Sequence, residues 1–147
     1  MHARRFAVLS VRVAVGAVLI GFGLSKFTQH AAEAASFDRY GLPDPSTFAY
    51  LIGVVELGLG ALLVVGLATR FAALGLAGNM VGAIATGGRV DGGLVNLVLA
   101  PALLVAMVAL VRTGAGGWSL DGVLRATLAQ RRPPTGRRRT RFARSPR

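Results

Sequence analysis

The chain has 147 residues, of which 53% are hydrophobic and 16% charged, and its mean hydropathy is +0.57, values outside the range of soluble globular domains. The net charge of +11 describes mainly the end of the chain, because eight of the seventeen basic residues lie in 131–147. Cysteine is absent, which excludes disulfide relays, thiolate nucleophiles and cysteine-ligated zinc or iron–sulfur centres within this chain.

The first half of the chain predicts two transmembrane helices. Residues 6–27 form the first, and its cleanest apolar run lies between Arg12 and Lys26, whose long side chains can reach the interfaces from the helix ends. Residues 48–68 form the clearest span, interrupted only by Glu56. Each stretch has the roughly 20 residues that a helix needs to cross the hydrocarbon core.

Two further spans follow. The third, at 71–86, is short and has to borrow flanking residues or lie in a thinned bilayer. The fourth, at 94–112, contains Pro101, which is tolerated where neighbouring helices satisfy the freed carbonyl. Four spans and their loops nearly use up the length, so no room is left for a soluble catalytic domain.

The connections carry turn and capping residues. Asp44 can cap the second span, and Pro45 suits the first turn of a helix. Thr69-Arg70 predicts a tight turn, and the glycine-rich segment 87–93 predicts a loop. Short connections force neighbouring helices to be antiparallel, so we expect an all-α, up-down-up-down transmembrane four-helix bundle.

The distribution of arginine predicts the orientation. One set of connections mixes basic with acidic residues, whereas the other set and both ends are basic, and the positive-inside rule places such segments in the cytoplasm. We therefore expect an inner-membrane protein with both termini cytoplasmic. The basic residues on that side are Arg4, Arg5, Arg12, Arg70, Arg112, Arg125 and the arginines of 131–147.

The start of the chain has a second interpretation. Arg4-Arg5, an apolar stretch and the small residues at 31–36 resemble a cleavable secretory signal. Lys26 interrupts the approach to the cleavage site, so retention as a membrane anchor is favoured.

The end of the chain predicts a short helix and a tail. Trp118 suits the membrane interface, and Ser119 can cap an interfacial helix. We expect a membrane domain over 1–125 and a basic, disordered cytoplasmic tail over 126–147. The tail is expected to bind anionic lipid headgroups, with a protein partner as the alternative, and nucleic acid is not expected.

Four polar residues within the spans are the candidate site. Glu56 is the most informative, because an intramembrane carboxyl is costly and normally faces a partner or a cavity. Glu56 and Asn79 fall near mid-bilayer, and Lys26 and Asn96 nearer the outer face, so a cluster with Lys26 as counter-ion is expected. The alternative is that these groups only hold helices together.

Small residues accompany the polar ones. Gly53, Glu56 and Gly60 share one face of the second span, and the third span carries a similar stripe. Such stripes predict close helix packing. The stripe of the third span consists of Gly75, Gly78, Asn79 and Gly82.

Known catalytic and metal-binding patterns were not found in the sequence. It contains no phosphate loop, dinucleotide fingerprint, serine–histidine–acid pattern or metal motif. His30 has no second histidine at ligand spacing, which predicts a solvated or interfacial side chain and not a metal ligand.

Several motifs resemble the DoxX family when taken together. They are GFGLSKF at 21–27, Phe37 with YGLP at 40–43, VVELGLGALLVVGLATR at 54–70 and GGWSLDGVL at 116–124. The resemblance covers roughly residues 10–125 and implies a four-span membrane protein. The positions that match the family pattern are Lys26, Pro43, Glu56, Arg70, Ser119 and Asp121.

The resemblance also implies a function. The family takes its name from subunits associated with quinol- and thiosulfate-linked oxidation, so we expect a redox-associated, quinone-linked membrane subunit with partner redox subunits. A non-enzymatic scaffold or assembly protein is the alternative, and a small-solute transporter is less favoured because no inverted repeat is evident.

Overall fold

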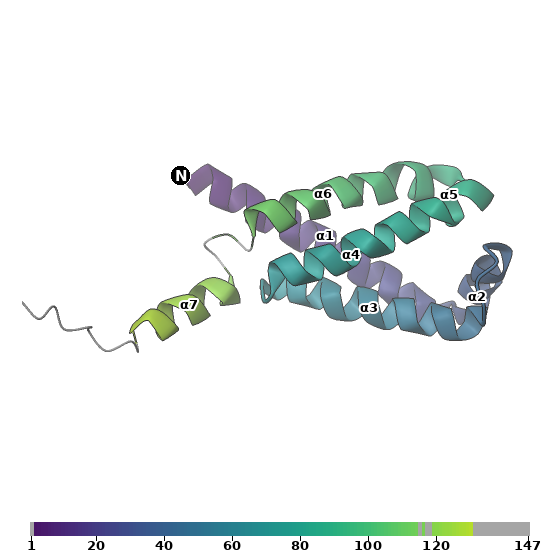
Figure 1. The fold of residues 1–147 in the computed structure, drawn as a ribbon, viewed down its shortest axis with the longest axis horizontal. Coiled ribbons are helices and arrows are strands. Elements are labelled where there is room, and N and C mark those ends of the chain that lie inside the picture. The colour runs from purple at the N-terminus through teal and green to yellow at the C-terminus, as the bar shows by residue number, and fades with distance from the viewer. Residues whose placement is uncertain (1, 115, 117–118, 131–147) are drawn as a thin grey trace, which may run out of the picture.

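The structure is a computed structural model that describes residues 2–114, 116 and 119–130. Its regular structure is helical, and no strand occurs among these residues (Figure 1). The elements in chain order are α1 (His2–Thr28), α2 (His30–Arg39), α3 (Pro45–Val65), α4 (Thr69–Ala85), α5 (Gly87–Val90), the π-helical turn η1 (Val95–Leu99), α6 (Ala100–Thr113) and α7 (Leu120–Gln130).

Four helical segments of 19 to 24 residues are long and apolar enough to cross a membrane. Their outer faces expose large apolar side chains, such as Phe71 at 71% and Val105 at 70%, which suit lipid tails and not water. The predicted all-α, four-span fold is confirmed, and the protein is a multi-pass membrane protein. The spans are Arg5–Thr28, Pro45–Val65, Thr69–Val90 and Val95–Thr113.

The turn between α3 and α4 comprises residues 66–68, so the prediction of a turn at Thr69-Arg70 is wrong. Gly66 has a φ of +76°, and its N–H donates to the carbonyl oxygen of Leu62 at 2.9 Å. A glycine in this left-handed conformation ends a helix. The second span therefore ends before 68, and Thr69 already belongs to α4. At the other end of α3, the predicted cap is confirmed, because the Asp44 carboxylate accepts from the N–H of Thr47.

Two short helices were missed in the sequence. α2 packs against α3 at one end of the bundle. α5 follows α4 after Thr86, so the third span reaches Val90 and the predicted loop at 87–93 is partly helical. The first residue of α5 packs closely against η1, because a Cβ on Gly87 would lie 2.9 Å from the amide nitrogen of Asn96.

Pro101 is accommodated by the backbone of its own span. It lies in the first turn of α6, directly after the π-helical turn η1. Proline lacks an N–H and its ring conflicts with the carbonyl four residues earlier, and a π turn relieves both problems locally. The fourth span continues across Pro101 as a helix.

α1 and α3 approach each other closely where glycines face each other. A Cβ on Gly23 would lie 2.9 Å from the carbonyl oxygen of Gly53, and a Cβ on Gly16 would lie 2.9 Å from that of Gly60. Contact of this kind is the usual packing device of membrane helices. The predicted face of the second span is confirmed, because Gly53, Glu56 and Gly60 are all buried.

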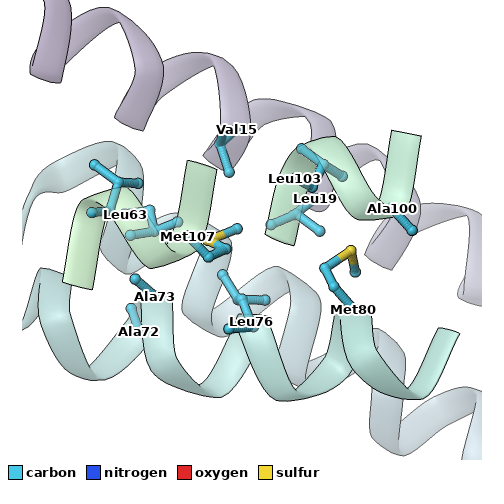
Figure 2. Packing of buried hydrophobic residues seen from close by; sticks show 12 residues of the cluster. Val15, Leu19, Leu63, Ala72, Ala73, Leu76, Met80, Ala100, Leu103 and Met107 are labelled. Atoms are coloured by element: carbon cyan, nitrogen blue, oxygen red, sulfur yellow. The ribbon is translucent and has the colours of Figure 1, made fainter. Parts of the chain in front are cut away.

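The apolar core extends from the α3–α4 turn to the middle of the bundle. Leu19, Leu63, Leu76 and Met107 are fully buried, one from each spanning helix, and lie together in Figure 2. Arg12 also lies in this half and is only 2% exposed, because the protein covers its side chain at the end of the bundle near the α3–α4 turn. The α3–α4 turn and the start of α7 enclose its side chain near Gly66.

The beginning of α7 is attached to the bundle. The Asp121 carboxylate accepts from the N–H groups of Ala68 at 3.0 Å and Thr69 at 3.3 Å. Ser119 Oγ accepts from the N–H of Gly122 at 3.1 Å, which confirms the predicted cap. Residues 126–130, which the prediction assigns to the disordered tail, belong to α7, so the tail prediction is wrong there. Trp118, for which an interfacial position is predicted, and the rest of the tail, 131–147, lie outside the described residues.

Candidate functional site

An open cavity of about 820 Å³ occupies the half of the bundle toward α2 and α5. α3 and α4 diverge from their shared turn toward this end (Figure 1). Most of the cavity wall is apolar, and one side of it carries a cluster of charged and amide side chains. The aromatic lining residues are Phe22, Phe37, Tyr40 and Phe48.

A buried ion pair lies in this cavity. Lys26 Nζ is 3.0 Å from Glu56 Oε2, and the two side chains are 10% and 5% exposed. Asn79 Nδ2 donates to Glu56 Oε1 at 2.8 Å. The close crossing of α1 and α3 allows the pair to form, because Gly53 lies one turn before Glu56 and its missing side chain leaves room for Lys26. The Lys26 side chain therefore lies inside the bundle, beside Glu56.

Glu33 joins the cluster from α2, and it was missed in the sequence. Its Oε2 lies 3.8 Å from Lys26 Nζ, and its Oε1 accepts from Ser25 Oγ at 2.9 Å. The only available signal was one acid within the alanine-rich run at 31–36, which favours a helix. The same run supplies the small residues of the alternative signal interpretation, which Lys26 disfavours.

Gly78 and Gly82 of α4 border the cavity and do not pack against another helix, whereas a Cβ on Gly75 would lie 2.7 Å from Leu59 Cδ1 on α3. A Cβ on Gly78 or Gly82 would meet nothing within 4 Å, and both residues are exposed and line the cavity. The prediction of close helix packing through these two glycines is therefore wrong. The cavity is open along this stretch of α4, within a membrane span.

The remaining predicted positions fall into two groups. Asn96 lines the cavity, but its amide donates to the carbonyl of Gly92 at 3.2 Å and makes no hydrogen bond to Glu56. Pro43 is exposed in the α2–α3 connection. Arg70, Ser119 and Asp121 line a separate recess of about 330 Å³ beside α7. No group of metal-ligating side chains occurs within the described part of the chain.

His30 anchors the start of α2 to the start of α3. Its ring stacks on that of Tyr50 with centroids 3.8 Å apart, and its Nε2 lies 2.9 Å from Ser46 Oγ. The side chain is half-buried at the end of the bundle. Its role here is to position α2, which carries Glu33.

A second contact fastens the other end of α2. Asp91, after α5, accepts from Arg39 Nη2 at 3.1 Å and from the Tyr40 hydroxyl at 2.5 Å. Burial and the hydrogen bond to Asp91 raise the pKa of Tyr40 to about 12. Hydrogen bonds from Arg39 and Tyr40 lower the pKa of Asp91. This contact, the α2 clamp, closes one edge of the cavity, because Tyr40 also lines it.

The α2 clamp is expected to open at both extremes of pH. The pKa of Asp91 is lowered, so its contribution is present above the ordinary carboxyl pKa and is lost as pH falls through the lowered value. The pKa of Tyr40 is raised, so its contribution is lost as pH rises from 10.0 to about 12. Spin labels at the exposed residues Ala35 and Val90 should give a narrow distance distribution near neutral pH and a broad one beyond these limits.

The matched variant is Asp91→Asn, which should broaden the same distribution already at neutral pH. The absence of cysteine makes the two labelling sites specific. A distribution that stays narrow in Asp91→Asn would show that α2 is held without the clamp.

Four spanning helices around a cavity with a buried ion pair define a small polytopic membrane protein. The DoxX family model matches residues 7–89, a range that includes Lys26, Glu56 and Asn79. The chain belongs to the DoxX family, as the sequence motifs indicated. Ser119 and Asp121 lie beyond the matched range.

Two relatives extend this comparison. The "Uncharacterized membrane protein Rv3486" of Mycobacterium tuberculosis is 36% identical over 129 residues, which cover 78% of this chain and 79% of that protein. The "Putative oxidoreductase CatD" of Bacillus subtilis is 40% identical over 78 residues, which cover 53% of this chain and 57% of that protein. No solved structure matches the chain.

Proposed function

We propose that this DoxX protein is a redox-associated membrane subunit whose cavity binds a quinone headgroup beside Lys26 and Glu56. The observation that carries the proposal is the cavity itself. Its volume of about 820 Å³ suits a ring with part of an isoprenoid chain, and its lining combines apolar walls with one polar cluster. The name of the Bacillus subtilis relative, which describes an oxidoreductase, supports the same class.

The opening along α4 supports a ligand that is dissolved in the bilayer. Gly78 and Gly82 lie in the third span, where exposed residues face hydrocarbon. A lipid-soluble molecule can enter there without crossing the aqueous phase. A water-soluble substrate has no comparable advantage from an opening at this depth.

The polar cluster has the hydrogen-bonding groups that a quinone needs. The Lys26 ammonium and the Asn79 amide donate, which suits a carbonyl oxygen, and the Glu56 carboxylate accepts, which suits a hydroxyl. A bound quinone would supply two-electron, two-proton chemistry. The chain lacks cysteine and carries no nucleotide motif, so we propose that a partner redox subunit delivers the electrons.

We also propose an orientation with α2 on the outer side of the inner membrane and both termini in the cytoplasm. The end of the bundle near the α3–α4 turn exposes Arg70 and Arg112. The α2 end mixes basic with acidic residues, so the positive excess lies at the turn end. The arginines of 131–147, outside the described residues, would bind anionic lipid headgroups on that same side.

The test is binding of decylubiquinone to the purified full-length protein in nanodiscs, together with the quinone content of protein purified from native membranes. Gly78→Leu should abolish binding by filling the cavity opening. Glu56→Gln should weaken binding about tenfold, the value of one hydrogen bond to a charged group. Gly58→Leu is the matched control, since Gly58 is exposed, has nothing within 4 Å of its Cβ and does not line the cavity.

Wild-type protein without bound quinone, or unchanged binding by Gly78→Leu, would overturn the proposal. A stable partner subunit recovered with a quinone-free protein would favour the assembly role instead.

A further inference from the structure

Lys26 has two carboxylate neighbours at different depths. Its Nζ lies 3.0 Å from Glu56 Oε2 and 3.8 Å from Glu33 Oε2. The exposed fraction of the side chains rises from 5% at Glu56 to 10% at Lys26 and 27% at Glu33. The three groups therefore form a continuous line from the buried wall of the cavity to the α2 end.

We infer that Glu33 is the carboxylate through which Glu56 exchanges protons with water at the α2 end, with Lys26 as the intermediate carrier. This inference deepens the proposed function, because reduction or oxidation of a quinone beside Glu56 requires protons. The exchange itself does not require the quinone, so the two proposals can fail separately.

The surroundings of Glu33 suit this role. Ser25 Oγ, on α1, donates to Glu33 Oε1 at 2.9 Å and holds the carboxylate toward Lys26. Glu33 itself is on α2, which lies outside the four spans and is held by His30 and by the α2 clamp. The facing groups from the other packed elements are uncharged, namely Asn79 on α4 and Asn96 on η1. The ionisable residues that line the cavity are Lys26, Glu33, Tyr40 and Glu56.

The transfer balances without an electron. Water on the α2 side first protonates the Glu33 carboxylate. The Lys26 ammonium then gives one proton to Glu56, and the lone pair left on Nζ takes the proton from Glu33. One proton has moved from water to Glu56, and the charges of Lys26 and Glu33 are restored. The flexible lysine stem allows Nζ to alternate between its two neighbours.

The experiment follows protonation of Glu56 by time-resolved infrared spectroscopy on the quinone-free, full-length protein in nanodiscs. Protons are released by laser photolysis of o-nitrobenzaldehyde at the pH where the Glu56 carboxyl band has half its full height. The band is identified by its loss in Glu56→Gln. Glu33→Gln should slow the rise of this band by about a hundredfold or more, the usual contribution of a positioned proton donor.

Three further variants make the result specific. Glu33→Asp should restore part of the rate, and Ser25→Ala should give an intermediate rate, because it only loosens the carboxylate. Asp38→Asn, on the exposed side of the same helix and away from the cavity, should behave as wild type. Far-ultraviolet circular dichroism checks that each variant keeps its helices.

A wild-type rate in folded Glu33→Gln would overturn the inference, even if quinone binding is found. If Glu33→Gln slows the band but decylubiquinone does not bind, the proton route stands and the quinone proposal falls. If Ser25→Ala and Asp38→Asn slow the band equally, the effect comes from general loosening of α2 and the inference is wrong.

Discussion

Lys26→Met is expected to be the most destabilising single change in the cavity. It leaves the Glu56 carboxylate, 5% exposed, with only the amide of Asn79 as a partner. Removing one member of a buried ion pair costs about 3 to 5 kcal/mol, because the remaining charge is desolvated without compensation. The converse change, Glu56→Gln, should cost less, since Lys26 keeps Glu33 within 3.8 Å.

The measurement is the free energy of unfolding in mixed detergent micelles, followed by circular dichroism. The double variant Lys26→Met with Glu56→Gln should recover much of the stability lost in Lys26→Met, because position 56 then no longer carries a buried charge without its cation, and the remaining carboxylate, Glu33, is more exposed. Equal losses in Lys26→Met and Glu56→Gln would contradict the asymmetry that Glu33 provides. Additive losses in the double variant would show that the pair is not coupled.

Gly23→Ala is expected to separate α1 from α3. Its new Cβ would lie 2.8 Å from Leu57 Cγ and 2.9 Å from the carbonyl oxygen of Gly53. The side chain of Leu57 can move, but the backbone oxygen cannot, so the helices must shift. Overpacking of this kind costs about 1 to 3 kcal/mol. The Lys26–Glu56 distance should also grow, since Lys26 lies one turn after Gly23 on α1 and Glu56 lies one turn after Gly53 on α3.

Gly21→Ala is the matched control on the same helix. A Cβ at Gly21 meets nothing within 4 Å, so alanine should be neutral or stabilise the protein by about 0.5 to 1 kcal/mol through its higher helix propensity. Unfolding in mixed micelles again gives both values. If Gly23→Ala proves as stable as Gly21→Ala, the close crossing of α1 and α3 is not needed for the fold.

The candidate cluster shows how far the sequence leads and where it stops. The cost of an intramembrane carboxyl singled out Glu56, and the depths of Lys26 and Asn79 suggested that the three could meet. The structure brings these three together. Asn96 was grouped with them by depth alone, but depth does not fix the direction of a side chain, and its amide binds the carbonyl of Gly92.

Glu33 could not be assigned from the chain alone. Its place in the cluster depends on α2 folding back against α3, through contacts such as His30 with Tyr50 and Arg39 with Asp91. The first pair is 20 residues apart in the chain and the second is 52 residues apart, so no local sequence pattern predicts either contact. The carboxyl of Glu56 suggested a partner or a cavity beside it, but the extent and lining of the cavity could not be predicted, because it lies between helices and has no periodicity of its own.

The sequence by itself determined the four spans, the cap at Asp44 and the family, because apolar length and capping are local properties and lipid requires each helix to satisfy its own backbone. Only the tertiary structure decided that Gly16 and Gly23 bring α1 against α3, that Gly78 and Gly82 border an open cavity, and that Glu33 approaches Lys26. The reason is physical. Small residues permit a close crossing but do not choose the partner helix, and that choice depends on the shape of all four helices at once.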